Sequence, residues 1–302
     1  MALDIFNFKI LDSPILGDHK CHFQRRLPIF SLYYAFASLW LPKRTKMNFD
    51  DLQISGIIGI EEKIGQFRRK LLEMKRLVIL SGAGMSAESG IRTFRDMNGL
   101  WEEYDVMEVA SIEAWHKNPA LLLHFYNDRR KQMIESKPNR GHMLLAELEK
   151  SYDVKIITQN VDDLHERAGS TNVLHLHGEL TKARSSVDPS LIYTLEDPEM
   201  NMGDKCEKGS QLRPHIVWFG EEVPAMADAV PIVESADYLC VIGTSMSVYP
   251  AAGLINYAPA FAPLFLIDPN PPASLPRRVQ VIAKGAGDGV AELVKKLEAL
   301  QK

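Results

Sequence analysis

The chain has 302 residues, of which 46% are hydrophobic and 25% charged, as in an ordinary soluble globular protein. Its three cysteines form no CxxC pair, which argues against a disulfide-rich secreted scaffold and favours a reduced, cytoplasmic setting. Residues 1–47 are basic, with seven Lys and Arg against three Asp, whereas the whole chain carries a net charge of −4. The acidic remainder lacks a basic stripe, which argues against a nucleic-acid ligand.

The first 46 residues differ in composition from the rest. An apolar run of 13 residues, 29–41, lies between two basic pairs. A transmembrane helix needs about 20 such residues, and the run lies late for a signal-peptide core. A membrane-surface anchor is one reading of it. We expect no membrane partner and interpret residues 1–46 as a poorly ordered extension ahead of an alternative start at Met47.

From residue 60 onward, hydrophobic periodicity indicates alternating helices and strands. Helical spacing marks 60–76, 140–151 and 288–300. Short continuous apolar runs, typical of buried parallel strands, occur at 77–84, 154–160, 172–178, 215–220, 238–245 and 263–268. This alternation predicts an α/β fold, a Rossmann-like doubly wound parallel sheet.

Two stretches interrupt the alternation. Residues 103–138 read as helices without a strand, and residues 179–213 are polar without clear periodicity. We expect both insertions to form a second, smaller domain within a catalytic domain of residues 47–302. The strand-like runs end in GAG, TQN, HG, FGE, GTS and IDPN. Ligands of doubly wound sheets bind at the carboxyl ends of strands, so these small and polar endings predict a nucleotide-type cleft.

LSGAGMSAESGIRTFR, residues 80–95, combines a strand end with a Gly-x-Gly turn and a helix start. Glycines let a backbone approach a pyrophosphate, and a helix N-terminus supplies amide donors. After Gly82 and Gly84 the next glycine is Gly90, so the spacing is not GxGxxG. No Lys follows as in a Walker loop, which disfavours ATP and GTP. The pattern alone fits a simple turn equally well.

Two further motifs stay ambiguous on their own. TQNVDDLHERAG, residues 158–169, places Asn160 and Asp162 at a strand end, where either suits a helix N-cap. VLHLHGEL, residues 173–180, carries His175 and His177, whose spacing puts both rings on one face of a strand. Spacing allows each ring to be a base, a metal ligand or a buried polar group.

Together and in this order, GAGMSAESGI, FR, TQNVDDLHERAG, HGEL, HIVWFGEEVP and GTS resemble the sirtuins, NAD-dependent protein-lysine deacylases. The resemblance spans roughly residues 60–300, and the GIRTFR and GLWEE wording is most similar to the bacterial CobB-type group. It implies NAD as cofactor and acyl-lysine proteins or peptides as substrates. The implied products are nicotinamide, lysine and O-acyl-ADP-ribose.

The resemblance also implies residue roles. His177 becomes the catalytic base, with Gln159, Asn160 and Asp162 in the nicotinamide–ribose pocket, and His175 becomes a structural residue. The other implied cofactor-binding residues are Gly82, Ala83, Gly84, Ser86, Ala87, Phe94, Arg95, Trp101, Gly243, Thr244, Ser245, Asp268, Asn270 and Ala286. The residues implied to hold the substrate backbone and the acyl-lysine are Val217, Trp218, Phe219, Gly220 and Glu221.

One pair of residues points to the acyl group. Tyr126 and Arg129 are three residues apart and share a helix face. Such a pair is usually a half-buried tyrosine beside a solvated arginine, but this YxxR matches the pair of desuccinylase-class enzymes. A bidentate Arg–carboxylate contact favours succinyl- or malonyl-lysine, with acetyl-lysine still accepted.

The sequence departs from most sirtuins in the interval that usually carries two zinc-binding CxxC pairs. Only Cys206 is present, Ser185 and Asp188 stand near the first pair, and Gly209 replaces the partner of Cys206. Closed zinc sites use four nitrogen or sulfur ligands, so we predict no zinc.

Three other functions compete with deacylation. A mono-ADP-ribosyltransferase can use the same cleft, and a non-catalytic module can bind NAD or an acyl-peptide. The joint presence of His177, Asn160 and Asp162 speaks against loss of catalysis. A dehydrogenase is disfavoured by the glycine spacing. No motif points to a particular oligomeric state.

Overall fold

The computed structural model describes residues 73–91, 100–101, 104–197, 199–244, 248–272, 275 and 277–300. The predicted extension at 1–46 and most of the predicted helix at 60–76 lie outside these residues. The described residues all belong to one structural unit, Gly65–Lys302. Within them, no helix has the length and apolar character that a membrane crossing requires.

The main sheet has six strands in the order β11-β10-β9-β1-β4-β5, and every neighbouring pair is parallel. The chain runs from β1 outward to β5, then returns to the other side of β1 and runs outward to β11. The strands are β1 Arg76–Ser81, β4 Asp153–Thr158, β5 Val173–His175, β9 Tyr238–Ile242, β10 Leu264–Ile267 and β11 Val279–Ile282. The predicted doubly wound sheet is confirmed, and its order reverses between β1 and β9, where such folds bind ligands.

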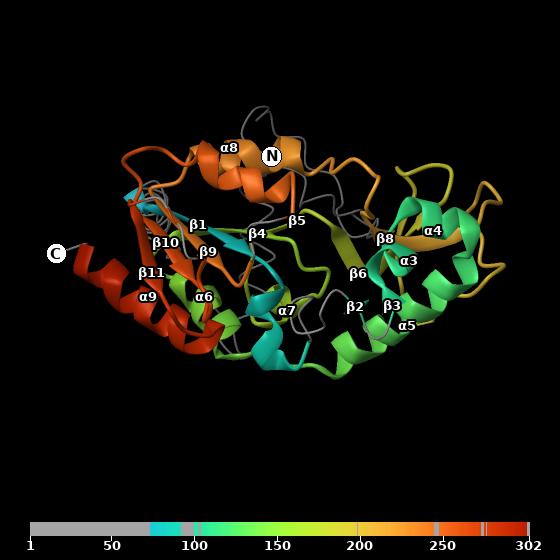
Figure 1. Ribbon diagram of the computed structural model, residues 1–302, viewed down its shortest axis with the longest axis horizontal. Helices are drawn as coiled ribbons and strands as arrows, with labels where there is room; N and C mark the ends of the chain where they lie inside the picture. Colours follow the sequence, from blue (N-terminus) through green and yellow to red (C-terminus); the bar gives the residue numbers. More distant parts are fainter. Residues whose placement is uncertain are drawn as a thin grey trace, which may run out of the picture. The chain divides into compact units, whose positions relative to one another are not determined.

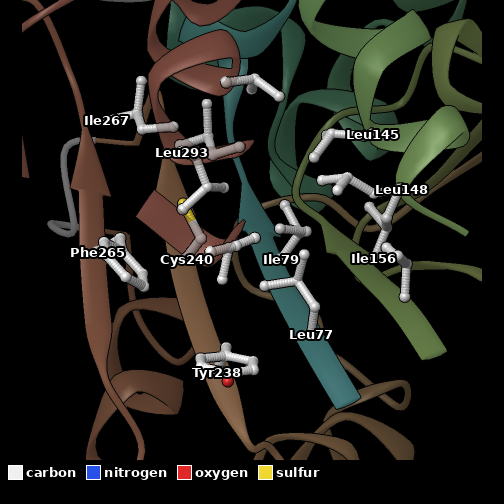
Figure 2. Close-up of a cluster of buried hydrophobic side chains, with 14 of the residues drawn as sticks. Leu77, Ile79, Leu145, Leu148, Ile156, Tyr238, Cys240, Phe265, Ile267 and Leu293 are labelled. Carbon is white, nitrogen blue, oxygen red and sulfur yellow. The ribbon is translucent and has the colours of Figure 1, made fainter. Parts of the chain in front are cut away.

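Helices cover both faces of this sheet (Figure 1). Alternate side chains of β1 point to opposite faces, so Leu77 and Ile79 enter one core while Val78 and Leu80 enter the other. The first core packs against α6 (Arg140–Leu148) and α9 (Ala286–Leu300), and Figure 2 shows Leu145, Leu148 and Leu293 facing the strands. The second packs against α8 (Met226–Glu234) and η5 (Ala251–Tyr257). Burial on both faces explains the continuous apolar runs of these strands.

A smaller antiparallel sheet, in the order β7-β6-β8, is separate from the main sheet. It shares a third core with the helices of residues 106–135, built around Leu122, Tyr126, Ala183 and Trp218. The remaining elements are β2 Leu100–Trp101, β3 Tyr104–Asp105, α3 Val106–Val109, α4 Ile112–Lys117, α5 Pro119–Glu135, α7 Leu164–Arg167, β6 Gly178–Ser185, β7 Ile192–Thr194, β8 Leu212–Ile216, η2 Ala83–Met85 and η3 Ala87–Ser89. We interpret the β7-β6-β8 sheet and the helices of residues 106–135 as the smaller domain.

Several strand predictions are wrong in detail. The run at 215–220 does not join the main sheet, because β8 ends at Ile216 and pairs antiparallel with β6. The run at 172–178 is divided between β5 and β6, so His177 lies between two strands. The polar stretch 179–213 contains β6 and β7. A short apolar run indicates burial but not which core buries it, and Trp218 belongs to the third core.

Two buried histidines join α6 to α7. His142 and His165 are 0% and 1% exposed, and their ring centroids are 4.8 Å apart. The amide of Asn139 donates to His142 Nδ1, and His165 Nε2 lies 3.0 Å from Ser81 Oγ. Burial lowers the pKa of His142 to about 4 and that of His165 well below its ordinary value. Both rings are therefore neutral in the folded protein at neutral pH.

This pair predicts that acid destabilises the fold well above pH 4. Below about pH 6.5 the unfolded chain protonates these histidines while the folded chain does not, so their contribution is complete above pH 6.5 and decreases below it. His142→Gln should reduce the loss of stability between pH 7.5 and pH 5 by on the order of 2 kcal/mol. Urea unfolding at both pH values measures it.

The matched control is His124→Gln, because the His124 side chain is 71% exposed. This variant should keep the pH dependence of the wild type. An unchanged pH dependence in His142→Gln would contradict the neutral buried pair.

Candidate functional site

The loops that follow β1 and β9 meet where the sheet order reverses. Gly82 N donates to Ile242 O over 3.0 Å, and Gly84 N donates to Gly243 O over 2.8 Å. A Cβ on Gly84 would lie 2.6 Å from Gly243 Cα, and Gly243 has a φ of +59°. The loops therefore touch backbone to backbone, which requires glycine on both sides.

The predicted helix start after these glycines is wrong. Residues 83–85 and 87–89 form two short 3-10 turns, with Ser86 between them at 0% exposure. The carboxylate of Glu88, in the second turn, accepts from Gly287 N at the start of α9. This contact brings the loop close to Ala286, one of the predicted cofactor-binding residues.

Ser86 cross-links the loop after β1 to the loop after β4. Its hydroxyl donates to Asp162 Oδ2 over 2.9 Å and accepts from Asn160 Nδ2 over 3.0 Å. Gln159 Nε2 donates to Thr244 Oγ1 over 3.1 Å, which ties in the loop after β9. Burial raises the pKa of Asp162, whereas the hydrogen bond from Ser86 acts to lower it. Side-chain hydrogen bonds thus join three loops that are far apart in sequence, through the buried Ser86 on one side and the half-buried Gln159 on the other.

His177 lies half-buried between β5 and β6, beside this network. Its Nδ1 is 3.1 Å from the main-chain oxygen of Gln159. A carbonyl oxygen only accepts, so Nδ1 carries the proton and a neutral ring has its lone pair on Nε2. Burial lowers the pKa of His177, although the bond to Gln159 acts the other way. The geometry gives a neutral imidazole with Nε2 as the basic nitrogen.

The predicted substrate segment 217–221 is tied closely to the rest of the protein. Val217 N donates to His177 O, and Phe219 N donates to Ala110 O. Trp218 N donates to Glu221 Oε2 over 2.8 Å. The amides of 217–219 therefore already donate within the protein, whereas the Phe219 side chain is 45% exposed.

An ion pair between the buried Arg213 and the half-buried Glu221 supports this segment, and Arg213 is not among the predicted site residues. Arg213 donates to both carboxylate oxygens of Glu221, and its guanidinium lies 3.5 Å from the Trp218 ring centroid. Arg184 also donates to Glu221. Burial acts to raise the pKa of Glu221, but the bonds from Arg213 and Trp218 N hold it below its ordinary value. The signal for this ion pair in the sequence was the presence of Arg184 and Arg213, the basic residues that lie on β6 and β8.

Tyr126 and Arg129 lie on α5, as predicted. Tyr126 is 1% exposed, its hydroxyl accepts from Trp218 Nε1 over 2.9 Å, and burial raises its pKa. Arg129 is half-buried, with its guanidinium 5.7 Å from the Phe125 ring centroid. The tyrosine is thus bonded directly to Trp218, one of the residues that the resemblance implies for substrate binding.

The position of the missing zinc cysteines is occupied by a small hydrogen-bonded cluster. Ser185 Oγ lies 2.8 Å from Ser210 Oγ, and Cys206 Sγ lies 3.0 Å from Ser210 Oγ. Asp188 forms an ion pair with Lys208 and donates its amide to Ser185 Oγ. Nowhere in the described residues do three His, Cys, Asp or Glu side chains gather as metal ligands. One thiol among hydroxyls does not fit a structural zinc site.

The remaining predicted cofactor residues divide into two groups. Asp268 follows β10 at 4% exposure, and its carboxylate accepts from Asn270 N over 2.8 Å. Gly243 N donates to Ile267 O, so Asp268, the next residue, lies beside the loop that contains Gly243. Phe94, Arg95 and Ser245 lie outside the described residues, as does the side chain of Trp101 on β2.

Comparison with known proteins now adds to this geometry. Residues 82–250 match the model of the Sir2 family. The chain belongs to this family. It is 58% identical to an NAD-dependent protein deacylase of Bacteroides thetaiotaomicron over 226 residues, covering 73% of this chain and 97% of the relative. It is 56% identical to an NAD-dependent protein deacylase of Helicobacter pylori strain 26695 over 225 residues, covering 74% and 98%.

Solved structures agree with this assignment to the Sir2 family. A complex of a Sir2 homologue with ADP-ribose is 39% identical, with a TM-score of 0.69, and the match covers 78% of this chain and 97% of that one. A complex of a Sir2 homologue with NAD is 38% identical, with a TM-score of 0.68 and coverage of 79% and 95%. The sequence resemblance to sirtuins is confirmed.

Proposed function

We propose that this Sir2-family chain is an NAD-dependent protein-lysine deacylase that releases nicotinamide, lysine and O-acyl-ADP-ribose. The observation that carries the proposal is the network of hydrogen bonds that joins the loops after β1, β4 and β9 beside a neutral His177. The printed names of its relatives, and the NAD and ADP-ribose in its structural neighbours, support the same activity.

The cofactor-facing residues suit NAD. The Gly84–Gly243 contact leaves bare backbone where a pyrophosphate can approach, and Ser86 and Thr244 add hydroxyl groups. In the proposed complex Asn160 and Asp162 face the nicotinamide, and their bonds with Ser86 support this role because they hold both side chains in place. When bound, NAD supplies a cationic leaving group. The chain itself supplies orientation, exclusion of water and a base.

His177 is the proposed base. Its Nδ1–H is held by Gln159 O, so the Nε2 lone pair can take a proton from a ribose hydroxyl. A lowered pKa keeps the ring unprotonated at neutral pH, which a base requires. The exposed Phe219 and Gly220, with the main-chain oxygen of Glu221, are the proposed contacts for the substrate backbone, since the amides of 217–219 and of 221 already donate within the protein.

His177→Ala tests the activity and the base together. Removal of a general base typically lowers the rate by about 10² to 10⁴-fold, so the variant should lose acyl transfer while keeping its fold. Mass spectrometry of acetyl-, succinyl- and malonyl-lysine peptides incubated with NAD measures the products. His124→Ala, an exposed histidine on α5, is the matched control and should retain activity.

Protein-linked ADP-ribose in place of O-acyl-ADP-ribose would instead support the ADP-ribosyltransferase. NAD binding without any product from the wild type would support a non-catalytic module.

We further propose that Arg129, with Tyr126, selects acidic acyl groups. Arg129→Met should lower kcat/KM for succinyl-lysine by about 10 to 100-fold, because a charge-assisted bond is lost. Acetyl-lysine turnover should change little. Lys131→Met is the control, because it removes a positive charge from the same helix, where Lys131 pairs with Glu199. Unchanged succinyl turnover in Arg129→Met would overturn this assignment.

We also propose that the smaller domain folds without zinc, held by the Ser185–Cys206–Ser210 cluster and the Asp188–Lys208 pair. Treatment of the purified protein with a chelator should leave its Tm and activity unchanged, because no thiolate cage is present to lose a metal. Metal analysis before and after treatment is the measurement. Stoichiometric zinc in the untreated protein would refute the proposal.

A further inference from the structure

His175, the last residue of β5, has both ring nitrogens engaged by neighbouring groups. Nδ1 is 2.9 Å from the main-chain oxygen of Asn160. Nε2 is 2.8 Å from Oε1 of Glu166, which lies on α7. The His175 side chain is only 6% exposed, whereas that of Glu166 is 40% exposed. The ring therefore connects α7 to the turn that carries Asn160.

The two partners determine the charge of this ring. A carbonyl oxygen can only accept, so Nδ1 donates to Asn160. An ionised carboxylate also only accepts, so Nε2 donates to Glu166 and the imidazole carries a positive charge. Burial acts to lower the pKa of His175, but the bond and charge of Glu166 outweigh it and the pKa lies above its ordinary value. Correspondingly, the pKa of Glu166 is lowered by His175 although burial acts to raise it.

His177 gives a contrast within the same segment. The rings of His175 and His177 bind the carbonyl oxygens of consecutive residues, Asn160 and Gln159. His177 has no carboxylate bonded to its ring among the described residues, and its pKa is lowered rather than raised. The same backbone contact thus occurs once with a cationic ring and once with a neutral ring.

We propose that His175 and Glu166 form a positioning pair that fixes the main chain of Asn160 and thereby orients the amide of Asn160 and the carboxylate of Asp162 toward NAD. This inference rests on the proposed function, in which Asn160 and Asp162 face the cofactor. His175 acts through Asn160 and is not a catalytic residue, because both of its nitrogens already donate within the protein.

The positive charge of His175 also affects the nearby carboxyl group of Asp162. Asp162 is 5% exposed, and burial favours its neutral form. The hydrogen bonds from Ser86 and Leu164 N act in the opposite direction, and the positive charge of His175 adds to their effect, so the pKa of Asp162 is raised less than burial alone would raise it. Glu166 and Glu179 also act on His175, while His165 experiences its charge. Within this group, Glu166 is the carboxylate bonded to the ring.

Glu166→Gln separates charge from shape. The glutamine amide can still bond to Nε2, by donating its N–H to the lone pair of a neutral ring, but it removes the negative charge that keeps the ring protonated. We expect KM and Kd for NAD to rise about 10-fold, with a smaller change in kcat and an unchanged Tm. Glu166→Asp, which keeps the charge, should recover part of the affinity. Glu147→Gln is the matched control, because Glu147 pairs with Lys150 at the surface of α6.

Nitrogen NMR of the histidine side chains measures the charge directly. In the wild type at pH 7.5, both His175 nitrogens should carry protons, whereas His177 should carry one, on Nδ1. In Glu166→Gln, His175 should lose one proton. A singly protonated His175 in the wild type, or an unchanged Kd for NAD in Glu166→Gln, would overturn the proposal.

These readouts distinguish failure of the pair from failure of the proposed function. NMR and calorimetric NAD binding need no turnover, so they judge the pair even where the wild type binds NAD without removing acyl groups. In that case the deacylase proposal fails. The proposed His175–Glu166 pair is still tested by the charge of His175 and by the Kd of the Glu166 variants for NAD.

Discussion

The contact between Gly84 and Gly243 is the constraint on which the site depends. The two loops leave adjacent parallel strands at the point where the sheet order reverses, and they meet without side chains between them. A Cβ on either glycine would overlap the backbone of the other loop, so the loops can approach this closely only with glycine at both positions. This approach brings Ser86 and Thr244 to the same edge of the sheet as Gln159. The polar network is therefore a consequence of backbone packing.

Once the loops are in place, burial makes their polar groups interdependent. Ser86 is fully buried, and its hydroxyl satisfies both Asn160 and Asp162. Loss of one partner leaves the others buried without a bond, which costs about 1–3 kcal/mol per group. The same logic holds in the smaller domain, where Glu221 receives two arginines and a main-chain amide. A buried carboxylate, Asp162, and a half-buried one, Glu221, thus each hold several neighbouring groups in place through hydrogen bonds.

The sequence predicted the main sheet well because its strands are buried on both faces. β1, β9 and β10 contain continuous apolar runs, β4 is apolar except for Asp153, Lys155 and Thr158, and each strand lies where expected. β8 was misplaced because Ile216 and Trp218 are equally apolar but belong to another core. The bond of Ser86 to Asp162 spans 76 residues, and no local pattern records such a distance. Arg213 lies only eight residues from Glu221, but its role depends on the chain folding back after β8 so that its guanidinium contacts both Glu221 and the Trp218 ring.

The two histidines of VLHLHGEL show most clearly what spacing can and cannot reveal. The sequence places them two residues apart, and the structure gives each the same kind of contact, from Nδ1 to a carbonyl of the TQN turn. Their chemistry diverges because, among the described residues, a carboxylate from α7 bonds to the ring of His175 and none bonds to the ring of His177. A ring between two acceptors must donate twice and becomes a fixed cation, whereas a ring with one acceptor keeps a lone pair. In the proposed function, the lone pair on Nε2 lets His177 act as a base. The second acceptor, Glu166, instead makes His175 a cation that positions Asn160.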